Sequence, residues 1–379
     1  MLRAVLVVFA VLAVFGTTSV IGALRTPGNA NFKAKWADWL RAHHASFVVN
    51  HLEHWYYTAQ APAPGGRPAG LNVVPQTTPP PVTVPNIVPN IVPEPITPGL
   101  SPPVAVPLVV FPALPAEGHW QPTGPLVGGR PGMYIAQYRA DTVYTGQITT
   151  AVWIDPHRLR VRLVPGAQEP GGTWPDPPFL AGPAADHAVA AFNGGFRFQD
   201  ARGGFYLDGR SAIPLRKGAA SIVIANDGRV DIGTWGAEVD MAPSVRAVLQ
   251  NLALLVDRGQ IDPSATHGDN AKWGFTLGAN TVVARSGIGV TATGALLYVA
   301  GPSLTIQTLA EALQRAGAVR AMTLDLNPEW VTFNLYAHNN PADPTQITAT
   351  KLYPQMNRPA TRFLGPTKES RDFFTVSTE

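Results

Sequence analysis

The chain has 379 residues, of which 38 are proline and 36 glycine, with no cysteine and only 14 % charged residues, against about 25 % in a typical soluble domain. The absence of cysteine excludes disulfides, thiolate metal ligands and a thiol nucleophile. Of the net charge of +3, residues 1–117 supply six Lys or Arg against four Asp or Glu, which leaves 22 against 21 in the rest. A nucleic-acid binder needs a clustered basic face. No run of the chain supplies one, so we expect no nucleic-acid partner.

Residues 1–25 predict a signal peptide or a membrane anchor. After Arg3 the chain is apolar from Ala4 to Phe15 and uncharged as far as Leu24. The apolar run suits the core of a signal peptide, and the whole uncharged stretch, at about 1.5 Å per residue, is long enough to cross a bilayer. We expect an extracytoplasmic main domain on a single N-terminal span at the cell membrane, or a secreted one if the segment is cleaved. The four Lys and Arg at 25–41 would favour the opposite orientation.

Residues 26–117 predict two further segments. At 26–60 apolar side chains recur at helical spacing, which indicates an amphipathic juxtamembrane helix. Its Trp and Tyr residues are typical of a membrane interface, and packing on a protein surface is an equally good interpretation. Residues 61–117 contain seventeen of the prolines. Because proline fixes φ and lacks an N–H donor, this stretch predicts an extended Pro-rich linker.

Residues 118–379 predict one α+β domain: a single mixed, largely antiparallel sheet with few helices. Short strand patterns alternate with turn signals along this part of the chain. The segments are an alternating strand at 158–164, an apolar strand at 188–192, two strands around an Asn-Asp-Gly turn at 221–232, a hairpin at 286–299, a helix at 305–316 that ends before Gly317, and a strand at 319–324.

Two apolar strands are followed by polar residues that can carry chemistry. Asn193-Gly194-Gly195 ends the first, and Asp325 follows the second. A glycine pair lets backbone N–H groups approach a ligand closely, although a plain turn and a capping carboxylate are the structural alternatives. The nucleophile elbow, the P-loop, the dinucleotide fingerprint and the H-E-x-x-H zinc motif are all missing. We expect no metal and no cofactor.

Taken in order, these motifs resemble the phosphodiester glycosidase family over roughly residues 148–335. The segments that carry the resemblance are Phe192–Phe196, Gln250–Asp257, Arg285–Gly289, Gly294–Val299, Thr305–Leu313 and Ala318–Asp325. The resemblance implies a hydrolase that cleaves the glycosidic bond of a phosphodiester-linked sugar. It also implies an exported or envelope protein.

The resemblance also implies site residues. Asn193, Arg285 and Asp325 match catalytic motif positions. Arg285 stands at the Arg of the family's Arg-Thr-Ala-Ile-Gly motif, where a guanidinium would meet the phosphate; a salt bridge to Asp325 is the structural alternative. The Asp325 carboxylate would stabilise positive charge at the anomeric carbon or activate water. The remaining candidates are expected to bind substrate: Gly194, Gly195, Ser286, Asp208 and Glu329. Of these, Asp208 or Glu329 is a possible second acid.

One loop departs from the family pattern. The family has Leu-Asp-Gly-Gly-Gly-Ser, whereas Leu326, Asn327 and Pro328 follow Asp325 here. Proline offers no N–H to a phosphate and leucine adds bulk. Two functions therefore stay open: an exported, membrane-anchored hydrolase acting on a sugar-1-phosphodiester or related cell-envelope glycan, and a non-catalytic envelope protein that uses the same fold to bind glycan or a protein partner.

Overall fold

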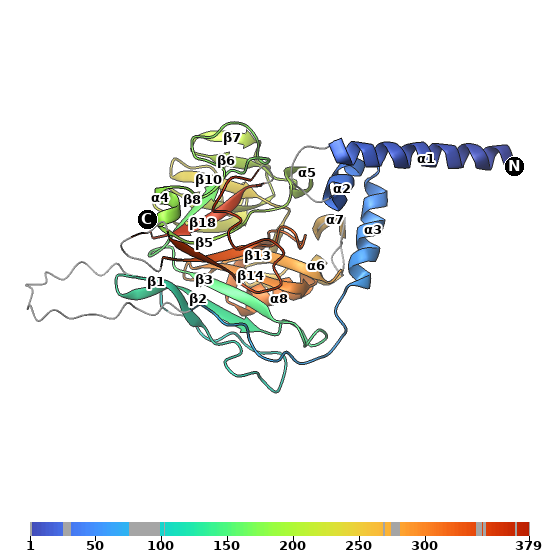
Figure 1. The fold of residues 1–379 in the computed structure, drawn as a ribbon. Helices are drawn as coiled ribbons and strands as arrows, with labels where there is room; N and C mark the ends of the chain where they lie inside the picture. The colour runs from blue at the N-terminus through green and yellow to red at the C-terminus, as the bar shows by residue number, and fades with distance from the viewer. Residues whose placement is uncertain are drawn as a thin grey trace, which may run out of the picture.

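The computed structural model describes residues 2–25, 32–75, 99–101, 103–267, 270–273, 281–338, 343, 346–367 and 370–378. The α+β class with antiparallel sheets and few helices is confirmed (Figure 1). The prediction of a single sheet is wrong, because the strands form sheets of eight, five and five strands. The number of sheets depends on pairings between segments far apart in the chain, which local patterns do not contain.

The first sheet, of eight strands, contains the predicted hairpin at 286–299 and the predicted strand at 319–324. Its strands are β1 (Gln121–Val127), β2 (Arg130–Tyr138), β3 (Thr149–Ile154), β11 (Leu254–Asp257), β12 (Gln260–Ile261), β13 (Val283–Thr291), β14 (Leu296–Leu304) and β15 (Ala318–Thr323). Their order across the sheet is β1-β2-β3-β14-β13-β15-β11-β12. The predicted hairpin is confirmed as β13 and β14, joined at a turn in which Gly294 has a φ of +91°.

The other two sheets share one buried apolar layer with the first. One consists of β6 (Phe205–Leu207), β7 (Arg210–Ile213), β8 (Ala220–Ala225), β9 (Val230–Thr234) and β10 (Val245–Gln250). The other consists of β4 (Arg160–Val164), β5 (Ala188–Asn193), β16 (Phe333–His338), β17 (Ile347–Lys351) and β18 (Phe373–Ser377). Their orders are β7-β6-β10-β8-β9 and β17-β16-β5-β18-β4. The two strands predicted around the Asn-Asp-Gly turn are confirmed as β8 and β9.

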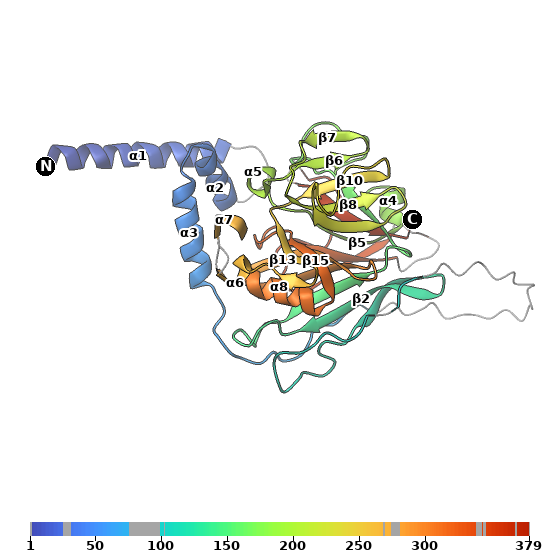
Figure 2. The ribbon, with the colours of Figure 1, turned by 180° about the vertical axis from the view of Figure 1, so that it is seen from behind.

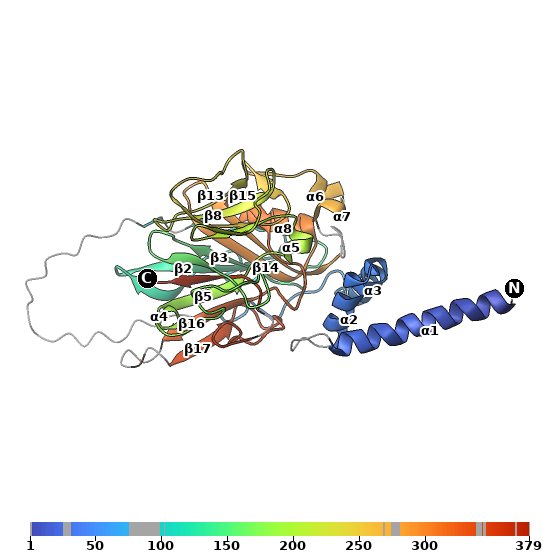
Figure 3. The same ribbon diagram turned by 90° about the horizontal axis from the view of Figure 1, so that it is seen from above.

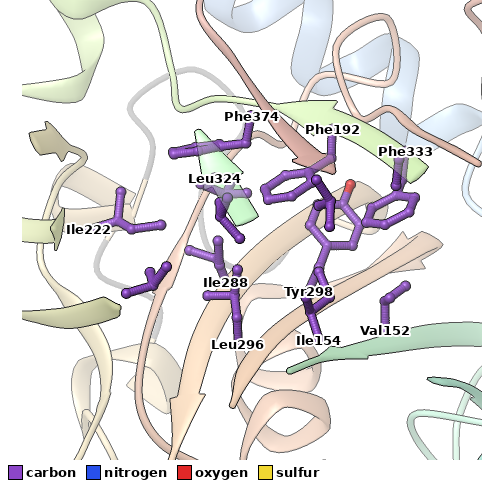
Figure 4. Close-up of a cluster of buried hydrophobic side chains, with 14 of the residues drawn as sticks. Val152, Ile154, Phe192, Ile222, Ile288, Leu296, Tyr298, Leu324, Phe333 and Phe374 are labelled. Atoms are coloured by element: carbon purple, nitrogen blue, oxygen red, sulfur yellow. The ribbon is translucent and has the colours of Figure 1, made fainter. Parts of the chain in front are cut away.

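Two apolar layers cover the two faces of the first sheet. Strand β14 shows both, because Leu296 and Tyr298 face the layer shared with the other two sheets, whereas Leu297 and Val299 face helix α8 (Ile306–Arg315). Figure 4 shows part of the first layer, with Phe192 beside the ring of Tyr298. Figure 2 shows α8 against the back of β13 and β15. Burial on both faces explains why the 295–299 segment is apolar throughout.

Helix α8 begins at the predicted place for a local reason. The Thr305 side chain accepts a hydrogen bond from the Thr308 N–H (3.1 Å), and the Thr308 hydroxyl accepts one from the Thr305 N–H (2.8 Å). This reciprocal capping pairs two N–H groups that a helix start leaves open.

The N-terminal residues form three helices beside the sheets: α1 (Leu2–Arg25), α2 (Phe32–Ala42) and α3 (Ser46–Ala59). Figure 3 shows α1 extending away from the body. The single helix predicted at 26–60 is wrong, since the chain breaks at His44, whose φ of +59° does not continue a right-handed helix. No helix in the described ranges is long and apolar enough to cross a membrane. The predicted membrane segment thus gains no support and stays a prediction.

The described parts of the proline-rich segment lie on the body. Val74 and Val106, one from each side, are buried in the two apolar layers. Glu117 forms a buried ion pair with Arg139 of the following segment, with 2.7 Å between Oε2 and Nη2. These flanks therefore pack where a free linker was expected, because apolar residues between the prolines reach the core. The centre of the predicted linker, 76–98, lies outside the described residues.

Candidate active site

Asn193, the last residue of β5, joins three elements at the centre of the site. Its Oδ1 accepts hydrogen bonds from the Tyr298 hydroxyl (3.0 Å) and the Thr332 N–H (3.1 Å). Its Nδ2 donates to Ser286 Oγ (3.1 Å) and to the Gly194 carbonyl (2.8 Å). Both ends of the amide are engaged inside the protein, so Asn193 holds β5, β13 and β14 together at this point.

Asp325, just beyond β15, is fixed against β13. The Ser286 N–H donates to its carbonyl (2.8 Å), and its own N–H donates to Ser286 Oγ (3.2 Å). The carboxylate accepts the Asn327 N–H at Oδ1 (2.9 Å) and Nη2 of Arg371 at Oδ2. Burial raises the pKa of Asp325 above its ordinary value, and the charge of Arg371 opposes that rise.

Arg371 and Asp372, which immediately precede β18, complete the cluster. The Gly194 N–H donates to the Asp372 carbonyl (3.1 Å). Both carboxylate oxygens of Asp372 are buried, and in the described part of the chain they have no hydrogen-bond partner. Burial raises the pKa of Asp372 to about 7, against the attraction of Arg371 and with the added repulsion of Glu169. A buried, unsatisfied carboxyl of this kind is a candidate acid.

The paired glycines make room for this carboxylate. A Cβ at Gly194 would overlap Asp372 Oδ2, whereas a Cβ at Gly195 would first meet Asn251 Cγ at 3.2 Å. Neither glycine has a left-handed φ. The close approach of Asp372, and not a strained turn, is therefore the reason for glycine at position 194.

Trp330 forms the next layer of the site. The guanidinium carbons of three arginines lie near the centroid of its ring, Arg371 at 3.9 Å, Arg362 at 4.9 Å and Arg358 at 5.3 Å. Glu329 lies at this edge, paired with Arg358 (3.4 Å, Nε to Oε2). Aromatic rings attract guanidinium groups stacked on them. The loop that lacks the family's glycines thus gathers positive charge around an indole.

Arg285 lies on the other face of β13 from Ser286, because successive side chains of a strand point to opposite faces. It is fully buried and donates to the carbonyls of Leu304 (2.8 Å) and Thr281 (3.0 Å). Burial lowers its pKa to about 9. The structure thus does not bring Arg285 to the Asp325 carboxylate, and the ion pair weighed between them is formed by Arg371 instead.

Asp208 also lies apart from this cluster. It stands at the turn between β6 and β7, where its carboxylate pairs with Arg246 (3.0 Å, Oδ1 to Nε). Of the sequence candidates, the structure groups Asn193, Gly194, Gly195, Ser286 and Asp325, with Glu329 at the rim. In the described ranges, no group of three or more His, Asp or Glu side chains is placed to hold a metal ion.

Residues 186–343 match the sequence model of the family described as phosphodiester glycosidase. The expected family resemblance is confirmed. The matched glycosidase segment contains Asn193, Ser286 and Asp325 but ends before Arg371 and Asp372, which sequence reasoning missed. The available signal was an Arg-Asp pair in front of the apolar run at 373–376, the same pattern of polar residues at a strand end that singled out Asn193 and Asp325.

Solved structures give weaker likenesses. The catalytic domain of zebrafish N-acetylglucosamine-1-phosphodiester alpha-N-acetylglucosaminidase, auto-inhibited by its pro-peptide, is 16 % identical over 65 % of this chain and 82 % of its own, with a TM-score of 0.40. A hypothetical protein from Synechocystis is 14 % identical over 66 % of this chain and 64 % of its own (TM-score 0.36). A putative exported protein from Burkholderia pseudomallei is 12 % identical over 63 % and 75 % (TM-score 0.30). No curated protein matches the chain.

Proposed function

We propose that the protein is a hydrolase that cleaves the glycosidic bond of a sugar-1-phosphodiester, or of a related cell-envelope glycan, at Asp325, Arg371 and Asp372. The observation that carries the proposal is one guanidinium held among buried carboxyl groups at adjacent strand ends, within and beside the glycosidase segment. A phosphodiester needs a cation, and glycosidic cleavage needs two carboxyl groups in different protonation states.

The environments of the two aspartates suggest their roles. Asp325, ion-paired with Arg371, is the carboxylate that stabilises positive charge at the anomeric carbon or activates water. Asp372, buried and without a hydrogen-bond partner among the described residues, is the acid that donates a proton to the departing phosphate oxygen. The C1–O bond breaks, water supplies the hydroxyl at C1, and the second proton of that water restores the acid. Arg371, with the arginines around Trp330, takes the phosphate role expected of Arg285.

The same cluster also favours a second candidate, a non-catalytic glycan or partner binder. Asp325 is only 2 % exposed and Asp372 3 %, so a substrate has to open a path to them. Leu326, Asn327 and Pro328 further remove the backbone donors of the family loop. For location, we propose that residues 1–25 export the protein and hold it at the membrane.

The two candidates are separated by turnover. The purified full chain should release free sugar from an N-acetylglucosamine-1-phosphodiester, and Asp325→Asn and Asp372→Asn should each lower kcat/KM by at least about 100-fold. Asp208→Asn, which removes an exposed carboxylate outside the cluster, should leave the rate unchanged. Full activity in both cluster variants would overturn the assignment. Binding of envelope glycan without sugar release would favour the binder.

A further inference from the structure

A second charged site lies at β4, the edge strand of the β17-β16-β5-β18-β4 sheet, where Arg158, Arg160 and Arg162 alternate with apolar residues. A cavity of about 310 Å³ opens between β4 and strands β8 and β10, lined by Arg160, Arg162, Arg246, Asn226 and Gly228 among others. Of these lining residues none is acidic. Arg160, Arg162 and Arg246 define what we call the arginine groove.

The guanidinium groups of this groove are incompletely neutralised. Nη1 of Arg160 donates to the backbone carbonyl of Asp227 (3.0 Å), a group that carries no full negative charge. Arg246 forms an ion pair with the half-exposed Asp208. Arg162 is exposed and, in the part of the chain that the structure describes, forms no ion pair or side-chain hydrogen bond. Among the described residues, one of the three arginines of the groove is therefore ion-paired, which leaves the groove cationic.

The backbone holds these charges in a fixed array. Arg160 and Arg162 occupy alternate positions of β4, so they leave the sheet on the same face about 7 Å apart. Arg158, the third arginine of the pattern, precedes the strand and is buried with Asp155 (3.4 Å). Gly228 lies against the groove with a φ of +88°, and a Cβ there would come within 2.8 Å of Arg160 Nη1. The positive φ of this turn is the reason for glycine at position 228.

The register of β4 relates the groove to the candidate active site. Thr375 pairs with Arg162 and Ser377 with Arg160, while Asp372 immediately precedes β18. At about 3.3 Å per residue, the two arginines stand about 10 and 17 Å from Asp372 along the strand. A ligand that reaches both the acid and the two arginines would therefore have to span about 10 to 17 Å.

We propose that the arginine groove binds further phosphate groups of an anionic, phosphodiester-linked polymer whose terminal sugar is cleaved at Asp325 and Asp372. Guanidinium groups bind phosphate through paired N–H donors, and several fixed cations along one edge suit a repeating anion better than a single small one. The choice of ligand rests on the proposed function, and the groove adds selection for long substrates.

The test compares a poly(glycerol phosphate) chain with monomeric glycerol phosphate, using the full-length protein and calorimetry at several salt concentrations. Arg160→Ala/Arg162→Ala should weaken polymer binding by about tenfold and reduce its dependence on salt. Turnover of a small N-acetylglucosamine-1-phosphodiester should stay unchanged. Arg160→Lys/Arg162→Lys, which keeps the charge but loses the paired donors, should lie between the double alanine variant and the wild type.

Arg229→Ala is the matched control, since this exposed arginine lies on the neighbouring turn, pairs with Asp227 and does not line the cavity. Unchanged polymer affinity in the double alanine variant, or an equal loss in the Arg229 variant, overturns the proposal. Asp372→Asn separates the two proposals, because it should lose turnover and keep polymer binding. If that variant turns over normally, the proposed function fails while the groove is still judged by its own binding result.

Discussion

Asp372 is the residue on which the proposed acid chemistry depends. A general acid works only while protonated, and burial raises the pKa of this carboxyl to about 7. We therefore expect kcat/KM to fall as the pH rises through about 7, and Asp372→Asn to remove that fall together with most of the rate. The measurement is a pH profile of sugar release from pH 5 to 9. A falling limb that persists in the variant would assign the acid to another group.

The same carboxyl predicts a pH dependence of stability. A carboxyl whose pKa is raised in the folded state binds more protons there than in the unfolded chain, so its contribution is fully present below the unfolded value of 3.8 and lost as the pH rises through about 7. Asn does not titrate. Asp372→Asn should therefore gain stability relative to the wild type between pH 5 and pH 8, by on the order of 1 kcal/mol or more. Urea denaturation of both proteins at pH 5 and pH 8 measures this. The same difference in free energy of unfolding between variant and wild type at the two pH values would contradict the prediction.

Gly194 and Gly195 offer a matched pair of substitutions at the same turn. Gly194→Ala places a methyl group on the Asp372 carboxylate, so we expect activity to fall by at least about tenfold. Gly195→Ala first meets Asn251 Cγ at 3.2 Å and should be tolerated better. Sugar release measured on folded samples, checked by circular dichroism, compares the two. Equal activity in both variants would contradict a role of the Asp372 carboxylate position in turnover.

At the scale of elements, helix α8 is stabilised by its own N-terminal cap and by packing on the first sheet. Its start depends on reciprocal bonds between Thr305 and Thr308. We expect Thr305→Ala to lower the free energy of unfolding by about 1 kcal/mol, and Thr305→Ser, which keeps the hydroxyl, to change it by much less. Urea denaturation measures both. A serine variant as destabilised as the alanine variant would point to packing of the threonine methyl group instead.

Strands β5, β15 and β18 deliver the site as a unit. Each strand has a site residue at one end. Asn193 is the last residue of β5, Asp325 follows β15 and Asp372 precedes β18. Pairing of β18 with β5 sets Phe373 opposite Asn193. Strand register therefore sets β5 and β18 side by side, and the hydrogen bonds that Ser286 accepts from Asn193 and Asp325 join them to β15 of the first sheet.

At the scale of the whole molecule, the ion pair between Glu117 and Arg139 ties the proline-rich flank to the body. Burial raises the pKa of Glu117, but hydrogen bonds from Arg139 and from the Leu114 backbone more than offset this and hold it below its ordinary value. Arg139 also donates to the carbonyls of Val110 and Pro112. The flank is therefore part of the folded domain.

This pair predicts a stability difference. Glu117→Gln leaves the buried Arg139 guanidinium without its anion, so we expect a loss of about 3 kcal/mol in the free energy of unfolding. Asp227→Asn, which breaks the solvent-exposed pair with Arg229, should cost less than about 0.5 kcal/mol. Chemical denaturation of the two variants tests this. A loss in Glu117→Gln no larger than that in Asp227→Asn would contradict the stabilising role of the buried pair.

The amino-acid sequence by itself determined the local units. Period-two alternation, the Asn-Asp-Gly turn and the glycine that ends the helix are written in neighbouring residues, so the two hairpins, helix α8 and the strand before Asp325 could be predicted. The ordered motifs also pointed to the family. The break at His44 was not visible, because a single left-handed residue leaves the apolar periodicity on either side intact.

Only the tertiary structure decided which of these residues meet. Strand alternation places Arg285 and Ser286 on opposite faces, but which face carries the site depends on the sheets that pack there. Arg371 and Asp372 reach Asp325 through the pairing of β18 with β5, about 180 residues apart in the chain. Local propensity contains no term for such long-range contacts. The sequence therefore specified the strands and their polar ends, and packing chose the charges that those ends share.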